Sequence, residues 1–327
     1  MTIRRKLFVL CVLIAGSTCL FAKEKKATLR IGFFPNLTHA QGVIGAYTDK
    51  QADLESWFGS RLGDEVELQW YCFNAGPSAM EALFAGSIDI TYVGPNPSLN
   101  AYMRSEGEEI RILSGSCRGG AALLVHPESG IEIPEDFKGK KIATPQLGNT
   151  QDIACRYWLM EHGLRISQIG GDAFVIPTKN PDQLNLFEQK KLDAVYTVEP
   201  WVSVLEVKGG AKCFYEESDS LVTVLACGSK ALEERKALVE SFLQAHKELT
   251  QWIIEHPEEA KELVSAGIAA EVHRPLDPEI VENAWKRLHF GTEVSVEDYE
   301  QIADAAEKAG FLKKHISLDR LIAPIME

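Results

Sequence analysis

Short apolar runs alternate with amphipathic segments through the first third of the chain. Runs of this length are typical of buried strands, and the segments between them repeat apolar residues at the spacing of a helix. Strands are expected at 28–34, 65–73, 88–93 and 110–114, and helices at 38–49, 76–84 and 99–103, the first of them capped by Thr38. This strand and helix order predicts a parallel sheet wrapped by helices.

The same order of elements begins again at residue 121. Strands are expected at 121–125, 141–144, 173–176 and 194–197, and helices at 134–137, 153–162, 181–190 and from about 200 to 208. The repetition predicts a second α/β unit.

From residue 222 onward the pattern changes to one strand followed by helices. The strand is expected at 222–227, and the helices at 231–256, 257–266, 278–288 and 296–309. A strand followed by a helical C-terminus can rejoin the first unit. We therefore expect two lobes, with lobe I formed by residues 27–117 and 221–327 and lobe II by residues 118–220. The two crossing segments, near 116–120 and 218–222, would form a hinge.

The N-terminus has a separate character. Basic residues at 4–6 precede an apolar run at 7–22, and charged residues follow directly. This pattern predicts an export signal over residues 1–22 and a periplasmic protein. Cys19 offers lipid attachment as an alternative to soluble release, and a buried N-terminal strand or helix is a third reading.

Composition excludes some functional classes of protein. The 327 residues carry a formal charge of −13 and no basic stripe with interleaved aromatic residues, so a nucleic-acid partner is not expected. Five cysteines remain after the signal, widely scattered and without C-x-x-C spacing. We expect them to be small buried hydrophobic residues rather than disulfides or metal ligands.

Candidate chemistry lies at five corners where a strand leads into a helix. Ligands of parallel α/β sheets bind beyond the carboxyl ends of the strands, where free N–H groups and the helix dipole favour an anion. Small and polar residues occupy the corners at 35–39, 74–78, 94–97, 146–151 and 198–201. Each corner alone is also what an ordinary helix start looks like, so the prediction of a binding site depends on their number.

Three side chains at these corners have competing interpretations. His39 is a neutral hydrogen-bond donor at a helix start, a simple helix cap, or an exposed surface residue. Glu199 could pair with an ammonium group of a zwitterionic ligand or with Arg118, or could simply be a first-turn residue that the helix dipole favours. Trp201 could cover an aliphatic chain of a ligand or pack internally.

Catalytic motifs are absent from the sequence. It contains no Gly-x-Ser-x-Gly elbow, no His-x-x-x-His metal spacing and no Gly-x-x-x-x-Gly-Lys phosphate loop. We therefore expect no catalysis, no metal and no cofactor.

Several motifs, in the same order along the chain, resemble the alkanesulfonate, taurine and nitrate solute-binding proteins of ABC importers. These motifs are Arg30-Ile31-Gly32-Phe33-Phe34-Pro35-Asn36, Ala82-Leu83-Phe84-Ala85-Gly86-Ser87-Ile88-Asp89-Ile90, Lys138-Gly139-Lys140-Lys141-Ile142-Ala143, and Asp193-Ala194 with Glu199-Pro200-Trp201. The resemblance implies an α/β type II periplasmic binding protein fold and a ligand held between the lobes. It also implies delivery of the ligand to a membrane permease that is powered by an ATPase, both on separate chains. We expect a monomer.

The resemblance also implies which positions touch the ligand. They are Asn36, Thr38, His39, Gly76, Pro77, Ser78, Asn149, Thr150 and Gln151, with Glu199 and Trp201 nearby. Asn96 belongs to a corner that is similar to phosphonate and phosphite binders. Our working hypothesis is that the ligand is an aliphatic sulfonate or taurine. The alternative ligands are nitrate, a phosphonate or a thiamine-pyrimidine precursor, and the alternative function is an enzyme on the same scaffold.

Overall fold

The computed structural model describes residues 26–313 and 316–324. The predicted export signal and Cys19 lie outside these residues. Within them, no helix is both long and apolar enough to cross a membrane.

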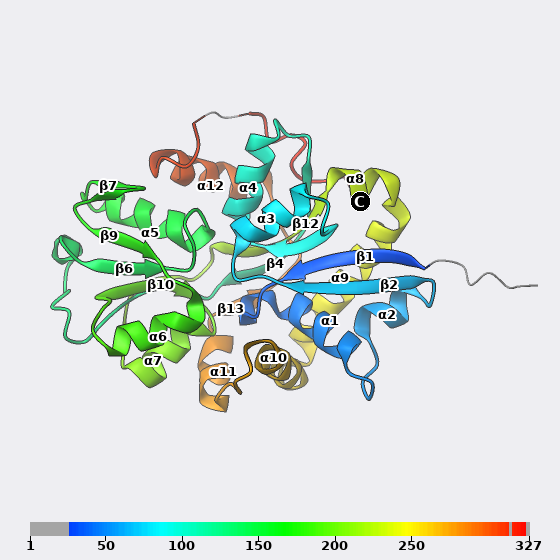
Figure 1. Ribbon diagram of the computed structural model, residues 1–327, viewed down its shortest axis with the longest axis horizontal. Helices are drawn as coiled ribbons and strands as arrows, with labels where there is room; N and C mark the ends of the chain where they lie inside the picture. The colour runs from blue at the N-terminus through cyan, green and yellow to red at the C-terminus, as the bar shows by residue number, and fades with distance from the viewer. Residues whose placement is uncertain (1–25, 314–315, 325–327) are drawn as a thin grey trace, which may run out of the picture.

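The first sheet has six strands in the order β13-β4-β12-β3-β1-β2 (Figure 1). The strands are β1 (Ala27–Phe33), β2 (Val66–Cys72), β3 (Ile90–Val93), β4 (Ile110–Gly119), β12 (Leu221–Gly228) and β13 (Leu288–Phe290). β1 runs parallel to β2 and β3, but β12 lies antiparallel to both of its neighbours, β3 and β4. β3 and β4 therefore point the same way, so β1 to β4 share one direction as expected, and the antiparallel strands of this sheet are the later β12 and β13. The chain leaves the sheet at the end of β4 and returns beside it at the start of β12, so β12 points the opposite way.

The second sheet has five strands in the order β11-β5-β10-β6-β9. The strands are β5 (Ala121–Val125), β6 (Lys141–Thr144), β9 (Phe174–Pro177), β10 (Ala194–Val198) and β11 (Lys212–Glu217). β10, β6 and β9 are parallel, whereas β5 is antiparallel to β10 and β11. A small separate pair, β7 (Ile166–Ser167) with β8 (Gly170–Gly171), lies beside this sheet.

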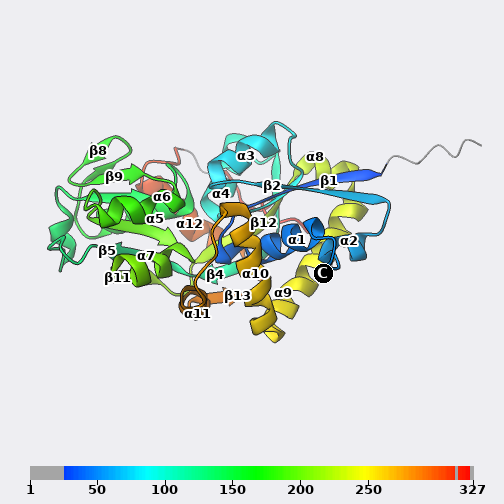
Figure 2. The same ribbon diagram turned by 60° about the horizontal axis from the view of Figure 1, so that its bottom comes forward.

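Helices cover both sheets (Figures 1 and 2). In chain order they are the 3-10 turn η1 (Leu37–His39), α1 (Ala40–Lys50), α2 (Trp57–Leu62), α3 (Gly76–Phe84), α4 (Pro95–Arg104), the 3-10 turn η2 (Pro134–Phe137), α5 (Thr150–Glu161), α6 (Asn180–Glu188), α7 (Trp201–Gly209), α8 (Ser229–Glu234), α9 (Lys236–Glu255), α10 (Pro257–Val272), α11 (Pro278–Trp285) and α12 (Val296–Lys308). The expected helix at 38–49 begins instead as η1, and no side chain caps it, so Thr38 is not a cap. The expected helix at 231–256 is divided into α8 and α9.

Two segments connect the sheets, and they lie side by side. One passes from β4 to β5 through Gly119 and Gly120, whose φ angles of 72° and 73° favour glycine. The other passes from β11 to β12, and the N–H of Gly119 donates to the carbonyl oxygen of Ser220 at 2.9 Å. The exact lobe boundaries, 117/118 and 220/221, and the hinge role of these segments stay predictions.

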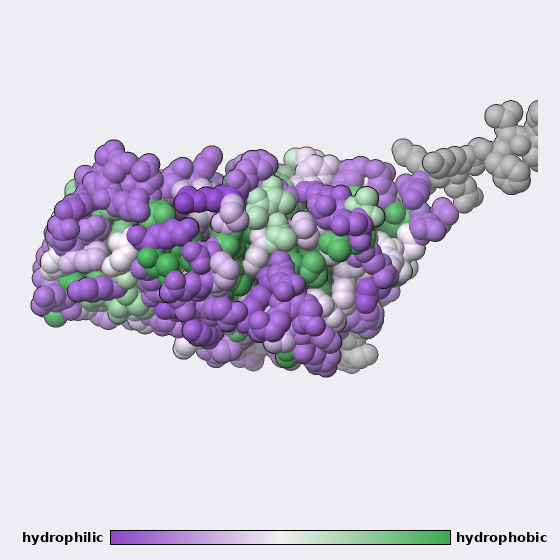
Figure 3. All heavy atoms as spheres, turned by 90° about the horizontal axis from the view of Figure 1, so that it is seen from below, coloured by the Kyte–Doolittle hydropathy of each residue, from purple (hydrophilic) through white to green (hydrophobic). Residues whose placement is uncertain are grey.

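The C-terminal helices pack against elements of both sheets. α12 packs against α4 and also against α5 of the second sheet, and α11 packs against α7. On the face seen from below, hydrophilic side chains dominate and hydrophobic ones form only small, separate patches (Figure 3).

Candidate functional site

Corners from both sheets enclose one narrow cavity of about 20 Å³, which has room for little more than one water molecule with the two sheets placed as they are in this structure. Seven of the predicted site residues line it: Asn36, Thr38, His39, Gly76, Asn149, Thr150 and Gln151. The structure thus brings together residues that lie more than 100 positions apart in the sequence.

The other five predicted residues lie outside this lining. Pro77 lines a separate apolar groove, and Asn96 lines a neighbouring cavity that shares Thr150 with the first. The hydroxyl of Ser78 contacts the side-chain amide of Gln146, 3.4 Å from its oxygen. Glu199 and Trp201 contact protein partners that are described below.

Nine lining residues were not among the predicted ligand contacts. They are Phe34, Asn74, Ala75, Gly94, Pro97, Pro145, Asn180, Val198 and Val222. Most of them lie in or beside the polar corners already identified. Asn180 lies at a sixth corner, where β9 leads into α6, and the pair Asn180-Pro181 was the available signal, since proline favours the first turn of a helix.

Four helices begin at the wall of this cavity. α3 and α6 start at Gly76 and Asn180, and α4 and α5 follow Gly94 and Asn149. Each helix start presents backbone N–H groups without an intrahelical acceptor and a positive partial charge. Since these starts come from both sheets, the cavity favours a negatively charged group held from two sides.

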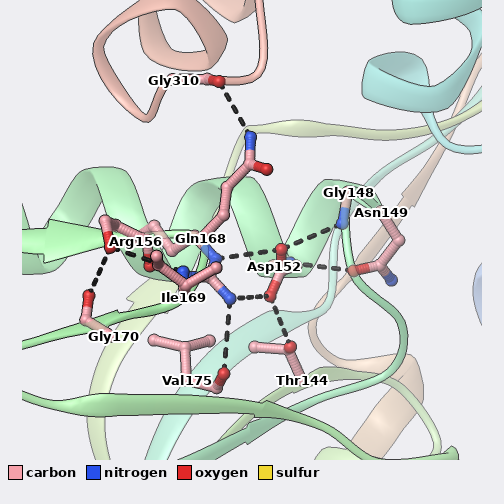
Figure 4. Close-up of polar contacts among 11 residues, drawn as sticks. Thr144, Gly148, Asn149, Asp152, Arg156, Gln168, Ile169, Gly170, Val175 and Gly310 are labelled. Atoms are coloured by element: carbon pink, nitrogen blue, oxygen red, sulfur yellow. Dashed lines mark hydrogen bonds and ion pairs between the residues drawn. The ribbon is translucent and has the colours of Figure 1, made fainter.

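Buried hydrogen bonds hold the start of α5 in place (Figure 4). Asp152 accepts from the Gly148 N–H at 2.9 Å and from the Thr144 hydroxyl at 2.8 Å, and it pairs with the buried Arg156. Its own N–H donates to Oδ1 of Asn149 at 2.9 Å. The first turn of α5, and with it Thr150, is therefore fixed before any ligand arrives.

Two polar atoms of the lining are buried without a partner. They are Nδ1 of His39 and Oγ1 of Thr150. Burial lowers the pKa of His39 to about 3, so its imidazole is neutral at physiological pH. A buried polar group without a partner costs free energy, so both atoms are candidates for hydrogen bonds to a bound ligand.

Glu199 does not face a ligand. Its side chain is fully buried, accepts from the N–H and hydroxyl of Ser203, and lies 3.0 Å from Nη1 of Arg287. Burial outweighs these contacts and raises the pKa of Glu199 to about 7. The suggested pairing with Arg118 was wrong, because Arg118 pairs with Asp298 instead.

Contacts across the cavity join the two sheets. The indole N–H of Trp201, in α7, donates to Oδ1 of Asn36, after β1, at 2.8 Å. Gly94 lies so close to α5 that a Cβ atom added to it would be 2.3 Å from Oγ1 of Thr150. The structure therefore has its two lobes in contact around the site.

Metal ligation finds no support among residues 26–313 and 316–324. They contain no group of three His, Cys, Asp or Glu side chains that could hold an ion. The five described cysteines are unpaired, and Cys72 and Cys213 are exposed rather than buried as expected.

Comparisons with known proteins agree with this architecture. A Bacillus subtilis protein named "Putative aliphatic sulfonates-binding protein" is 27% identical over 277 residues, covering 83% of this chain and 79% of that one. The "Taurine-binding periplasmic protein" of Escherichia coli is 26% identical over 163 residues, 49% of this chain and 47% of that one.

Solved structures resemble the fold. The alkanesulfonate-binding protein of Xanthomonas axonopodis pv. citri bound to MOPS superimposes with a TM-score of 0.72 at 20% identity, covering 92% of this chain and 98% of that one. The periplasmic nitrate-binding protein of Synechocystis PCC 6803 has a TM-score of 0.68 at 15% identity, with 88% and 83% covered. These relatives are binding proteins, in agreement with the expectation that the chain is not an enzyme. Residues 22–269 match the NMT1-like family, so the chain belongs to that family and has the periplasmic binding protein fold.

Proposed function

We propose that this chain is the solute-binding component of an ABC importer that captures a small sulfonate-like anion between its lobes. The observation that carries the proposal is the cavity itself, where helix starts from both sheets converge and where His39 and Thr150 leave polar atoms unpaired. The named relatives include binders of aliphatic sulfonates and taurine. A membrane permease, powered by an ATPase on a further chain, would receive the ligand.

The lining favours a ligand of low charge. None of its residues carries a formal charge, since His39 is neutral and no Lys, Arg, Asp or Glu takes part. A monoanion can be held by neutral donors and helix dipoles, whereas a dianion would lose more hydration without a compensating cation. Within the proposed class, the lack of a lining carboxylate favours a simple alkanesulfonate over taurine, whose ammonium group would find no partner there.

Location and assembly follow the same reasoning. We expect a monomer exported to the periplasm, where its lobes close on the ligand and the closed form is what the permease reads. Closing requires a ligand that binds the closed state better than the open one.

A ligand screen tests the proposal. Calorimetric titration and thermal shift should be measured with methanesulfonate, taurine, nitrate, methylphosphonate and an aminopyrimidine. We expect methanesulfonate to bind and to raise the melting temperature. Stabilisation by the phosphonate or the pyrimidine alone would contradict the ligand class, and stabilisation by nitrate alone would favour the nitrate alternative.

A matched pair of variants tests the site. Thr150→Val removes the unpaired hydroxyl from the cavity and should weaken binding by about 1 kcal/mol or more. Thr223→Val removes another buried, unpaired hydroxyl that does not line the cavity, so it should leave the affinity unchanged. Equal affinities of both variants and the wild type would place the site elsewhere.

A further inference from the structure

The orientation of one amide in the cavity is set from outside it. Oδ1 of Asn36 accepts the indole N–H of Trp201, and Trp201 does not line the cavity. An indole nitrogen can only donate, so the oxygen of Asn36 must face Trp201. This leaves the NH₂ group of Asn36 for a ligand.

A second amide is oriented through a chain of two bonds. The backbone N–H of Asp152 donates to Oδ1 of Asn149, and Nδ2 of Asn149 donates to Oε1 of Gln151 at 3.1 Å. Figure 4 shows the first of these bonds. Since a backbone N–H can only donate, it determines the orientation of the Asn149 amide and, through it, of the Gln151 amide. Gln151 therefore also keeps its NH₂ group free.

A third amide follows the same logic. Nε2 of Gln183 donates to the backbone carbonyl of Thr178 at 3.0 Å and to Oδ1 of Asn180 at 3.2 Å. The hydroxyl of Thr197 also contacts this oxygen at 3.1 Å. Because the carbonyl of Thr178 can only accept, the atom of Gln183 that faces it is the donor Nε2, and the atom of Asn180 that Nε2 also contacts is the oxygen. The NH₂ group of Asn180 therefore remains free for a ligand.

Three lining amides therefore present only donors. Within the part of the chain that the structure describes, the NH₂ groups of Asn36, Gln151 and Asn180 form no hydrogen bond. Two of the three orienting anchors lie in the same local segment as the amide they orient. The anchor of Asn36 is different, because Trp201 belongs to the second sheet and Asn36 follows a strand of the first.

We propose that Trp201 is a positioning residue that fixes Asn36 as a donor when the lobes meet, and so selects ligands that offer only acceptors at this point. The inference rests on the proposed function and adds which contact decides the ligand selectivity of the site. In the open protein the Asn36 amide would be free to turn, and closure would restrict it. A ligand with an N–H or O–H group facing Asn36 would meet another donor and be rejected.

Two isosteric probes measure this selectivity. Methanesulfonate is an anion with only acceptor oxygens, whereas methanesulfonamide is neutral and carries an NH₂ group in place of one oxygen. Because the charge difference is the same for every variant, the readout is the change of preference between wild type and variant. Wild-type protein should prefer methanesulfonate by about tenfold or more. Trp201→Phe keeps a ring but removes the donor, and it should reduce that preference by about threefold or more, because Asn36 can then turn. Trp57→Phe is the matched control, since its indole N–H donates to Ala245 O at 3.1 Å, away from the cavity, and it should leave the preference unchanged.

The outcomes separate the inference from the proposed function. Equal weakening of both probes by Trp201→Phe would mean that Trp201 acts by packing alone, and would overturn the inference. A wild-type protein that binds no anion would contradict the proposed function.

A second measurement tests the contact itself. The hydrogen exchange of the Trp201 indole N–H can be followed by ¹⁵N–¹H NMR in protein saturated with methanesulfonate, where the lobes are closed. Asn36→Ala removes its acceptor and should speed this exchange by about threefold or more, whereas the exchange of the Trp57 indole should not change. Unchanged exchange at Trp201 would overturn the coupling between the two residues.

Discussion

Arg287 forms an ion pair with Glu199 across 88 positions of sequence, with 3.0 Å between Nη1 and Oε1. The same guanidinium contacts Glu206 and Glu216. It therefore neutralises a fully buried carboxylate and ties the segment after α11 to the second sheet. Breaking a pair of this kind leaves an uncompensated buried charge.

We predict that Arg287→Met destabilises the protein in a pH-dependent way. At pH 8 the free energy of unfolding should fall by about 3–5 kcal/mol. Near pH 5 the loss should be smaller, because Glu199, whose pKa is already about 7, can take up a proton in the folded state. Urea unfolding at both pH values measures the difference.

Two further variants make this prediction specific. Adding Glu199→Gln to Arg287→Met removes the buried charge and should recover part of the loss at pH 8. Arg165→Met breaks an exposed pair with Asp172, which solvent screens, and should cost far less than Arg287→Met. A loss from Arg287→Met that is equal at both pH values would contradict the assignment to Glu199.

Acid stability should depend on His246. It is buried between Tyr92, whose hydroxyl lies 3.2 Å from Nδ1, and the carbonyl of Gly115, 3.0 Å from Nε2. Burial lowers the pKa of His246 to about 4. Between pH 6.5 and 4 the unfolded chain binds a proton there that the folded protein does not, so stability falls as the pH falls.

The test compares wild type with His246→Gln across that pH range. The free energy of unfolding of wild type should fall more steeply than that of the variant, by up to about 1.4 kcal/mol per pH unit. Denaturant titrations at intervals of half a pH unit would show it. Parallel curves would mean that His246 ionises equally in both states.

Ligand affinity should be insensitive to the ionisation of His39. With a pKa of about 3 it is neutral from pH 5 to pH 8, and a neutral imidazole offers the same hydrogen bonds throughout. Calorimetric titration with methanesulfonate at pH 5, 6.5 and 8 should give dissociation constants within about twofold of one another. Binding that tightens below pH 6.5 and loses this dependence in His39→Gln would show that the imidazole binds as a cation.

Lobe closure should depend on the absence of a side chain at Gly94. A Cβ atom there would lie 2.3 Å from Oγ1 of Thr150, across the cavity. Gly94→Ala should raise the dissociation constant by about tenfold, because the lobes could no longer approach, while the ligand-free melting temperature stays nearly unchanged.

Gly130→Ala is the control for Gly94→Ala, because here the added methyl group meets no neighbour. Its φ of 70° disfavours alanine and nothing lies within 4 Å of the added Cβ atom. It should lower stability modestly and leave the affinity intact. If Gly94→Ala bound as tightly as wild type, the observed contact between Gly94 and Thr150 would not form in the ligand-bound protein.

The sequence by itself determined most of the elements. Apolar runs and helix-start signals act over a few residues, so β1, β2 and α3 lie within one or two residues of their expected bounds. The corners that meet at the cavity were also visible, because each strand end and helix start is encoded locally. Seven of the predicted site residues line the cavity for this reason.

Only the tertiary structure decided how these parts are paired. The insertion of β12 between β3 and β4, and the short strand β13 after α11, depend on partners far away in the chain. Glu199 was visible as a carboxylate at a corner, but its partner Arg287 was not. The direction of the Asn36 amide likewise depends on Trp201 from the other sheet. Charge pairing and hydrogen-bond orientation depend on which side chains the topology brings within about 3 Å of one another. Local sequence patterns do not specify these neighbours.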